Sequence, residues 1–376
     1  MPKYLPPDAL VALINKEFGA NTLVRAKDAV GLVKPRLSTG SFALDLQLGG
    51  GFPEGAITLL EGDKGSSKSW TMNTMAAMFL QTHKNGVFIL VNAEGTNDHL
   101  FLESLGVDTA RTFFLQPESG EQAWDAAIKA AQFAEKVFIG VDSLDACVPL
   151  TELEGDVGDA KYAPAAKMNN KGFRKLISAM KPDLTSTDQR VTAVFITQLR
   201  EAIGVMFGDP KRSVGGMGKA FAAMTIIRLS RIKVLRTEGD TVAEKKSYGL
   251  EIEAHITKNK GWGEGEKVKW TLYKENHEGF RRGQIDNVTE LIPFLLVYKI
   301  ADKKGAWITL GTDQYQGDKD LAAQLRINDE LRAWCIAQVK EAHAKRYEMQ
   351  EEVPAPTPSI VNKGTSALKR LPKKGK

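Results

Sequence analysis

Residues 56–69 read AITLLEGDKGSSKS, an apolar segment that runs directly into a turn rich in glycine and serine. The apolar residues 56–61 predict a buried strand, and the residues from the turn through Lys84 predict a helix. Backbone N–H groups in such a turn can surround a phosphate, and the N-terminus of the helix adds the positive end of its dipole. This stretch therefore predicts a phosphate-binding loop between a strand and a helix, the P-loop arrangement.

All residues of this loop are candidate nucleotide contacts, namely Gly62, Asp63, Lys64, Gly65, Ser66, Ser67, Lys68 and Ser69. Lys68 would reach the β- and γ-phosphates, and the Ser69 hydroxyl would ligate Mg²⁺. The usual pattern has glycine directly before the lysine, where this chain has Ser67. If that position needs a left-handed backbone, serine costs ~1–2 kcal/mol there. A turn that binds nothing is the alternative interpretation.

Two further apolar strands end in carboxylates. The strand at 137–141 leads into Asp142, which could hold Mg²⁺ through water. Glu94 ends the strand FILVNAE (88–94), where it could orient or deprotonate an attacking water. The alternatives are that Asp142 caps a helix and that Glu94 is a solvated carboxylate.

The rest of the middle of the chain alternates between the two kinds of element. Further strands are expected at 86–91 and 191–197, and helices at 121–135 and 165–181. This alternation predicts an α/β fold with a mostly parallel central sheet. The segments 225–231, 250–258 and 268–274 lack long helices between them and predict an antiparallel extension of that sheet.

Both ends of the chain differ from this pattern. Leu10, Leu13, Ile14 and Phe18 recur at helical spacing, so a short helix is expected at 8–18, packed on its own chain or on a neighbour. Helices are also expected at 288–298, 320–327 and 329–343. We predict an N-terminal segment at 1–35, a core at 36–283, a small domain at 284–350 and a disordered tail at 351–376.

Composition excludes several classes of protein. The 376 residues are 43% hydrophobic and 26% charged, as in ordinary globular proteins. Residues 354–376 hold six basic and no acidic residues, so the remaining chain, with 45 basic and 46 acidic residues, is nearly neutral. We find no secretory signal and no apolar run of the ~20 residues that a membrane helix needs. Cys147 and Cys335 are too few for a disulfide framework, and a cytoplasmic setting is expected.

Short motifs along most of the chain occur together in one order. They are KEFG (16–19), LSTGSFALD (37–45), the loop at 62–69, NAEG (92–95), SLGVD (104–108), QPESGEQA (116–123), VDS (141–143), ELEGDVGD (152–159), FRKL (173–176), IGVMFGDP (203–210), KNK (258–260) and KGAW (304–307). In this order they resemble the RecA-type DNA recombinases, and the likeness extends over residues 8–345. The resemblance implies a P-loop NTPase core of the RecA type, with a short N-terminal polymerisation helix and a small C-terminal α+β domain.

The resemblance also implies roles for single residues. Lys68 and Ser69 match the phosphate and Mg²⁺ residues, Glu94 the residue that activates water, and Asp142 the second carboxylate beside Mg²⁺. Gln198 matches the residue that senses the γ-phosphate. Asp98, Phe101 and Tyr273 match residues that pack against the adenine. Lys258 and Lys260 match a pair that reaches the neighbouring subunit's ATP. The two lysines are spaced i, i+2 on an expected strand and share a face, although a pair of exposed strand lysines is the alternative.

Two segments are expected to contact DNA. The first is the loop at 154–163 with the helix that follows it, and the second is the glycine-rich loop at 199–218. Their candidate DNA contacts are Tyr162, Lys167, Asn170, Arg174, Arg200, Ile203, Lys211 and Arg212. Basic residues here would attract phosphates without regard to sequence, and Tyr162 and Ile203 match positions that insert between bases in the family. The alternative for the second loop is an ordinary lid.

The resemblance implies an ATP- and Mg²⁺-dependent protein that forms a filament on single-stranded DNA and exchanges strands with duplex DNA. Its candidate partners are both forms of DNA, further copies of itself, and single-strand-binding and loader proteins, but no membrane. Ser67, together with Asn92 where the family often has aspartate, fits a phage-encoded or divergent member. A ring helicase or translocase, and a DNA-coating filament that does not hydrolyse ATP, are the alternative functions.

Overall fold

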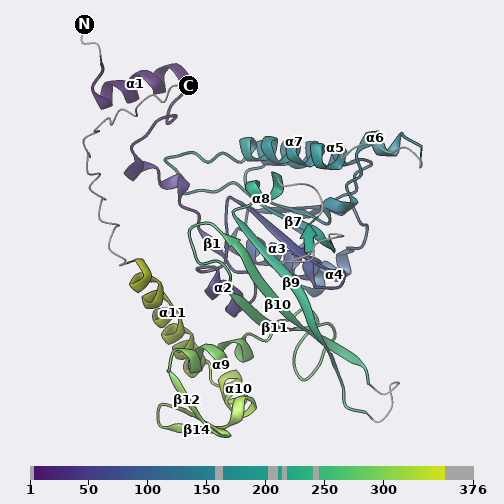
Figure 1. Cartoon of the computed structure of the whole chain (residues 1–376), viewed down its shortest axis with the longest axis vertical. Coiled ribbons are helices and arrows are strands. Elements are labelled where there is room, and N and C mark those ends of the chain that lie inside the picture. The colour runs from purple at the N-terminus through teal and green to yellow at the C-terminus, as the bar shows by residue number, and fades with distance from the viewer. Residues whose placement is uncertain (1–3, 157–163, 202–210, 214–217, 240–244, 352–376) are drawn as a thin grey trace, which may run out of the picture.

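The computed structural model describes residues 4–156, 164–201, 211–213, 218–239 and 245–351. Within these ranges a nine-stranded sheet forms the centre of the molecule (Figure 1). Its strands are β3 (Ile57–Gly62), β4 (Val87–Val91), β5 (Thr112–Leu115), β6 (Val137–Val141), β7 (Val191–Glu201), β8 (Lys211–Ser213), β9 (Thr225–Arg236), β10 (Ser247–Asn259) and β11 (Lys267–Tyr273). No helix in the described residues is long and apolar enough to cross a membrane.

The strands follow the order β11-β10-β9-β3-β7-β6-β4-β5, and β8 pairs with β7 outside this path. All neighbours from β9 to β5 are parallel, which confirms the predicted α/β fold with a mostly parallel sheet. The prediction for 225–231 was wrong in one respect, because β9 pairs in parallel with β3. The antiparallel extension therefore begins only at β10.

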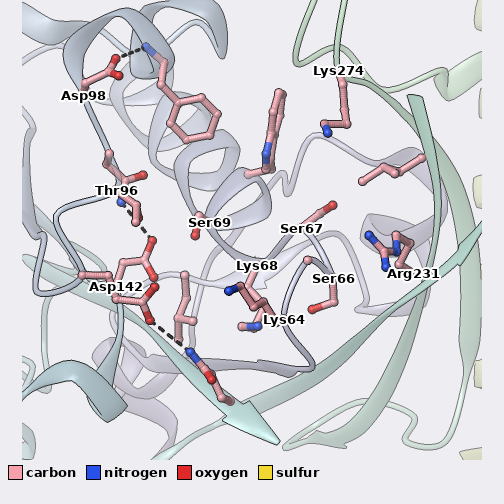
Figure 2. Close-up of a pocket in the computed structure, with 18 of the residues that line it drawn as sticks. Lys64, Ser66, Ser67, Lys68, Ser69, Thr96, Asp98, Asp142, Arg231 and Lys274 are labelled. Carbon is pink, nitrogen blue, oxygen red and sulfur yellow. Dashed lines mark hydrogen bonds between the residues drawn. The ribbon is translucent and has the colours of Figure 1, made fainter. Parts of the chain in front are cut away.

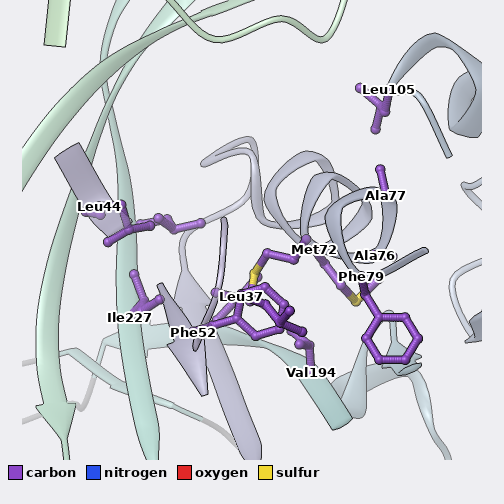
Figure 3. Close-up of a cluster of buried hydrophobic side chains, with 14 of the residues drawn as sticks. Leu37, Leu44, Phe52, Met72, Ala76, Ala77, Phe79, Leu105, Val194 and Ile227 are labelled. Atoms are coloured by element: carbon purple, nitrogen blue, oxygen red, sulfur yellow. The ribbon is translucent and has the colours of Figure 1, made fainter. Parts of the chain in front are cut away.

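Helices cover both faces of the sheet. Leu60 faces α3 (Lys68–Thr82) in one apolar cluster, part of which Figure 3 shows around Met72 and Phe79. Its neighbour Leu59 faces α5 (Gly120–Phe133) and α7 (Pro164–Ala179) in a second cluster. Because successive side chains of a strand point to opposite faces, a continuous apolar run is needed to fill both clusters.

The N-terminal helix α1 (Pro7–Phe18) lies apart from the sheet in Figure 1. It ends at Phe18, close to the expected bounds of 8–18, and the following Gly19 has a φ of 110°, which favours glycine. None of its residues is buried, and the Phe18 side chain is 67% exposed. The chain then attaches to the core at Gly31, whose N–H donates to the Leu184 carbonyl.

The C-terminal elements gather around a third apolar cluster. They are α9 (Asn287–Val297), β12 (Ala301–Lys304), β13 (Trp307–Leu310), β14 (Asp313–Gln316), α10 (Gly317–Ile327) and α11 (Asp329–Glu351). The three helices coincide with the expected ones, and the antiparallel sheet β12-β13-β14 supplies the strands of the expected α+β domain. The boundaries predicted around this domain stay predictions, and the tail at 352–376 lies outside the described residues.

The remaining elements join these layers. They are β1 (Arg36–Leu37), α2 (Phe42–Gln47), β2 (Phe52–Pro53), α4 (His99–Ser104), α6 (Leu150–Leu153) and α8 (Gly218–Ala222). Glu290 on α9 holds the C-terminal elements to α2, because its Oε2 accepts hydrogen bonds from Ser41 Oγ at 2.8 Å and from Ala43 N at 2.7 Å. Burial raises the pKa of Glu290 to about 8.

Candidate nucleotide-binding site

A cavity of about 460 Å³ lies where several parallel strands end (Figure 2). It is lined by Lys64, Gly65, Ser66, Ser67, Lys68, Ser69, Trp70, Glu94, Thr96, Asn97, Asp98, Phe101, Asp142, Ile196, Gln198, Arg231, Leu250, Lys274 and Arg282. The strands β3, β4, β6 and β7 deliver residues to it from one edge of the sheet, which is where open α/β sheets usually bind ligands.

The loop at 62–69 has a backbone suited to close approach by a ligand. A Cβ on Gly62 would lie 2.4 Å from the Leu229 carbonyl oxygen and 2.5 Å from Ser66 Oγ, so no side chain fits at this position. Ser67 has φ 67° and ψ 25°, which is the left-handed conformation in which a serine before the lysine was expected to be strained. A serine therefore stands where the backbone favours glycine.

Lys68 lies at the first turn of α3 and is largely buried. Its Nζ donates to the carbonyl oxygens of Gly62, at 2.9 Å, and Asp63, at 2.8 Å. Burial lowers the pKa of Lys68, and the nearby carboxylates of Asp142 and Glu94 oppose this shift. A phosphate in the loop would offer this ammonium a charged acceptor in place of two neutral ones.

The buried hydroxyls of Ser66 and Ser67 have no hydrogen-bond partner among the described residues. Two orphaned hydroxyls beside a buried lysine at a helix N-terminus fit an anionic ligand with several acceptor oxygens. The loop therefore matches the chemistry of a phosphate chain.

Asp142 and Glu94 line the same cavity as the loop, and Figure 2 labels Asp142. Asp142 is 2% exposed, and burial raises its pKa, while hydrogen bonds from Ser69 and Asn97 lower it. The pairing of a serine hydroxyl with a carboxylate supplies the oxygen ligands that Mg²⁺ prefers. No cluster of three His, Cys, Asp or Glu side chains suited to a metal occurs in the described ranges, and Mg²⁺ beside phosphates needs only one or two protein carboxylates.

Glu94 Oε1 accepts hydrogen bonds from Ser143 Oγ at 2.6 Å and from Gln198 Nε2 at 3.3 Å. The backbone N–H of Gln198 donates to Asp145 Oδ2 at 2.7 Å. The structure thus brings Glu94 and Gln198 into direct contact, three residues before β7 ends at Glu201 and immediately before the loop at 199–218 that is the second candidate DNA segment.

The far end of the cavity is aromatic. Asp98 caps α4 by accepting a hydrogen bond from Phe101 N at 2.7 Å. The Phe101 and Trp70 rings meet edge to face with centroids 4.9 Å apart, and the Arg282 guanidinium lies 5.7 Å from the Trp70 ring and 5.9 Å from the Phe101 ring. The sequence predicted Asp98 and Phe101 here, but it missed Trp70, although the position directly after Ser69 could have drawn attention to it.

The sequence also missed Thr96, Asn97, Ile196 and Leu250, which line the cavity as well. Three basic cavity residues were missed too, namely Arg231, Lys274 and Arg282. They come from β9 and from the turns after β11, which are far in sequence from the loop at 62–69. No local pattern marks them, because only the pairing of β9 with β3 and the order of β10 and β11 bring them to this edge.

Tyr273 does not line the cavity, in contrast to the expectation that it packs against the base. Its ring stacks on Phe280 with centroids 4.1 Å apart and an interplanar angle of 6°. Burial raises the pKa of Tyr273 to about 12. The aromatic stack holds this ring against the turn after β11, and its expected contact with the base stays a prediction.

Lys258 and Lys260 also lie outside the cavity. Lys258 Nζ donates to the carbonyl oxygens of Ala220 and Ala223, on or next to α8, and Lys260 follows the last residue of β10. The two lysines therefore lie beside the C-terminal end of the second candidate DNA loop, and their predicted action on a neighbouring subunit stays a prediction.

Of the candidate DNA contacts, Tyr162 and Ile203 lie outside the described residues. The backbones of Arg200 and Arg212 are paired between β7 and β8, with Lys211 next in register. The α7 candidates Lys167, Asn170 and Arg174 are spaced i, i+3 and i+7, so they share one face of the helix.

The two candidate DNA segments meet at Gly218. A Cβ on Gly218 would lie 2.0 Å from Asn170 Oδ1, so the start of α8 packs directly on α7. The end of the second loop therefore lies against the helix that follows the first.

Comparison with known proteins agrees with this geometry. The family model of the RecA N-terminal domain matches residues 7–264. Curated proteins named Protein RecA are similar along most of the chain. The one from Nocardioides sp. is 32% identical and the alignment covers 86% of this chain and 87% of the relative, while the one from Rubrobacter xylanophilus is 31% identical and covers 92% and 95% of the two chains. The one from Thermus aquaticus is 30% identical, and the alignment covers 90% of this chain and 93% of the relative. A crystal structure of the RadB recombinase aligns with 63% of this chain and 96% of its own chain, at 17% identity and a TM-score of 0.44. The chain therefore belongs to the RecA family of DNA recombinases.

Proposed function

We propose that this chain is a DNA-dependent ATPase that forms filaments on single-stranded DNA and exchanges strands with homologous duplex DNA. Membership of the RecA family implies DNA recombination or repair with ATP and Mg²⁺. The observation that carries the finer proposal is the meeting of Lys68, Glu94, Asp142 and Gln198 around one cavity. Gln198 also begins the connection from this cavity to a candidate DNA loop.

In this proposal the loop at 62–69 binds the triphosphate. Lys68 leaves the carbonyls of Gly62 and Asp63 and pairs with the phosphates, while the N–H groups at the start of α3 donate to the phosphate oxygens. Ser69 and Asp142 would hold Mg²⁺, which neutralises charge on the phosphate oxygens when bound.

Glu94 is the proposed base. Its carboxylate accepts the proton of the attacking water while Ser143 holds Oε1 at 2.6 Å. Gln198 shares the same oxygen at 3.3 Å, a long contact that a γ-phosphate oxygen could replace. Such an exchange of partners at Gln198 would move the start of the second loop, and nucleotide occupancy would then change the affinity for DNA.

Self-assembly is supported by two exposed apolar surfaces. The helix α1 exposes Leu10, Leu13 and Phe18. The edge strand β5 exposes the adjacent side chains Phe113 (56% exposed) and Phe114 (44% exposed), and in the described part of the chain it pairs only with β4. A large exposed helix face and an uncovered strand edge both favour a protein partner, and we infer that neighbouring copies of this chain cover them.

The ATPase proposal is tested with Lys68→Ala and Glu94→Ala. We expect Lys68→Ala to lose affinity for a fluorescent ATP analogue, and Glu94→Ala to bind it but to release phosphate at least ~100-fold more slowly with single-stranded DNA, because it lacks the base. The exposed Lys84→Ala serves as the control. Normal turnover in both site variants would contradict the site assignment.

Experiments on the purified unmodified protein distinguish the two alternative functions. Nucleotide binding without any DNA-stimulated turnover in the unmodified protein would favour a coating filament that does not hydrolyse ATP. Closed rings rather than helical filaments in electron micrographs with single-stranded DNA would favour a helicase or translocase.

A further inference from the structure

Three buried asparagines form a chain of hydrogen bonds that ends on Asp142. Asn73 Nδ2, from α3, donates to Asn97 Oδ1 at 2.9 Å. Asn97 Nδ2 in turn donates to Asp142 Oδ2 at 3.0 Å and to Asn92 Oδ1 at 3.2 Å. The exposed fractions are 0% for Asn73, 5% for Asn92, 6% for Asn97 and 2% for Asp142, so these side chains depend on protein groups for their hydrogen bonds. Asn73 Oδ1 has no such partner among the described residues.

Asn92 fixes the loop that carries Asn97. Asn92 Nδ2 donates to the Asn97 carbonyl at 2.9 Å, and Asn92 Oδ1 accepts from the Asn97 backbone N–H at 3.3 Å. These two bonds close a ring between the end of β4 and the loop before α4. The Asn97 backbone is therefore held independently of its own side chain.

The Asp142 carboxylate sets the direction of the hydrogen bonds that run from Asn73 through Asn97. An ionised Asp142 can only accept hydrogen bonds, so the Asn97 amide must turn its NH₂ group toward it. The Asn97 carbonyl oxygen then points away and needs a donor, which Asn73 supplies. The opposite orientation of the Asn97 amide would place two acceptor oxygens against each other at Asp142 and two NH₂ groups against each other at Asn73.

Resting on the proposed function, we infer that Asn97 is a positioning residue that holds the Asp142 carboxylate in the orientation needed to bind Mg²⁺ with ATP. Asn97 engages Oδ2 from the side of α4, while Ser69 meets the carboxylate from the side of the phosphate loop. Asn73 and Asn92 hold Asn97 in this orientation. Groups that orient a metal-binding side chain commonly change metal affinity ~10- to 100-fold when they are removed.

If these amides only stabilised the fold, their replacement would affect stability but not metal affinity. Three buried amides placed only for packing could be replaced by aliphatic groups with an effect on stability alone. A positioning role instead predicts a change in metal affinity that thermal stability does not follow.

The test uses Asn97→Leu in the full-length protein. Binding of a fluorescent ATP analogue is measured as Mg²⁺ is titrated, and Mn²⁺ affinity in the presence of the same analogue is measured by electron paramagnetic resonance. We expect the half-saturating metal concentration to rise ~10-fold or more, whereas binding of the analogue in EDTA should stay within about twofold of the unmodified protein. Asn73→Leu should shift the metal titration in the same direction by a smaller factor.

The matched control is Asn169→Leu, which also removes a buried amide. Asn169 Oδ1 accepts a hydrogen bond from Trp124 Nε1 at 2.9 Å, away from the cavity. It should lower the melting temperature without changing the metal titration. If Asn97→Leu folds poorly, Asn97→Ala provides the same comparison with a smaller side chain.

Two results would overturn the inference. One is a metal titration of Asn97→Leu that coincides with that of the unmodified protein. The other is an equal loss of binding with metal and in EDTA, which would mark a structural role. If the unmodified protein itself binds no ATP analogue at any Mg²⁺ concentration, the proposed ATPase function has failed instead, so the two failures are distinguishable.

Discussion

Replacing Ser67 by glycine should stabilise the protein. The Ser67 backbone, at φ 67° and ψ 25°, is in the left-handed region, which costs a residue with a Cβ ~1–2 kcal/mol. Glycine adopts this conformation freely but loses roughly 0.5–1 kcal/mol more conformational entropy on folding. The difference leaves a net gain of about 0.5–1 kcal/mol in the free energy of unfolding.

Thermal unfolding followed by calorimetry or circular dichroism measures this gain. At ~2–4 °C per kcal/mol for a domain of this size, Ser67→Gly should raise the melting temperature by roughly 1–4 °C. The strain is present with and without nucleotide, so relieving it should not itself change the affinity for an ATP analogue. A loss of affinity in Ser67→Gly that Ser67→Ala shares would instead report the removal of the Ser67 hydroxyl from the phosphate site.

Two control variants separate strain from other effects. Ser67→Ala removes the unpartnered hydroxyl but keeps the Cβ, so it should melt below Ser67→Gly. Ser66→Gly places glycine where φ is not positive and should lower stability by roughly 0.5–1 kcal/mol. Equal melting temperatures for Ser67→Gly and Ser67→Ala would refute the assignment of strain to this position.

Other predictions concern the rest of the chain. Glu290 has a pKa raised from 4.5 to about 8, so its stabilising contribution is complete below about pH 4.5 and is lost as the pH rises toward 8. Between pH 5 and pH 8.5 the melting temperature of Glu290→Gln should therefore fall less than that of the unmodified protein. Trp70→Ala should weaken binding of a fluorescent ATP analogue ~10-fold, since an aromatic contact of about 1–1.5 kcal/mol is lost, whereas Trp307→Ala on β13 should not. Phe18→Ser should raise the protein concentration needed for filaments ~10-fold or more by sedimentation, because an apolar contact worth roughly 1.5–3 kcal/mol is removed; unchanged sedimentation would contradict a role of α1 in assembly. Deleting 354–376, which holds six basic residues, should lower the salt dependence of duplex binding, and an unchanged salt slope would contradict that role.

Local sequence determined the fold class and the main part of the site. The apolar strands at 57–62, 87–91 and 137–141 are each followed within a few positions by a functional residue, namely Lys68, Glu94 and Asp142. Parallel strands end at one edge of a sheet, so Lys68, Glu94 and Asp142 had to lie near one another once the strands were recognised. The motif likewise indicated that the backbone at Ser67 could be left-handed, because glycine usually occupies this position.

Pairing between distant strands decided what local sequence could not. Arg231 reaches the cavity because β9 pairs in parallel with β3, a pairing that no short pattern encodes. Tyr273 stacks on Phe280, seven positions later, and this contact forms only when the turn after β11 folds back. The asparagine chain joins α3 to the ends of β4 and β6, so its contacts exist only after these elements pack. Sequence determined which residues each strand end presents, while tertiary packing decided which of them meet, since hydrogen bonds and ring contacts depend on distances that only the assembled sheet sets.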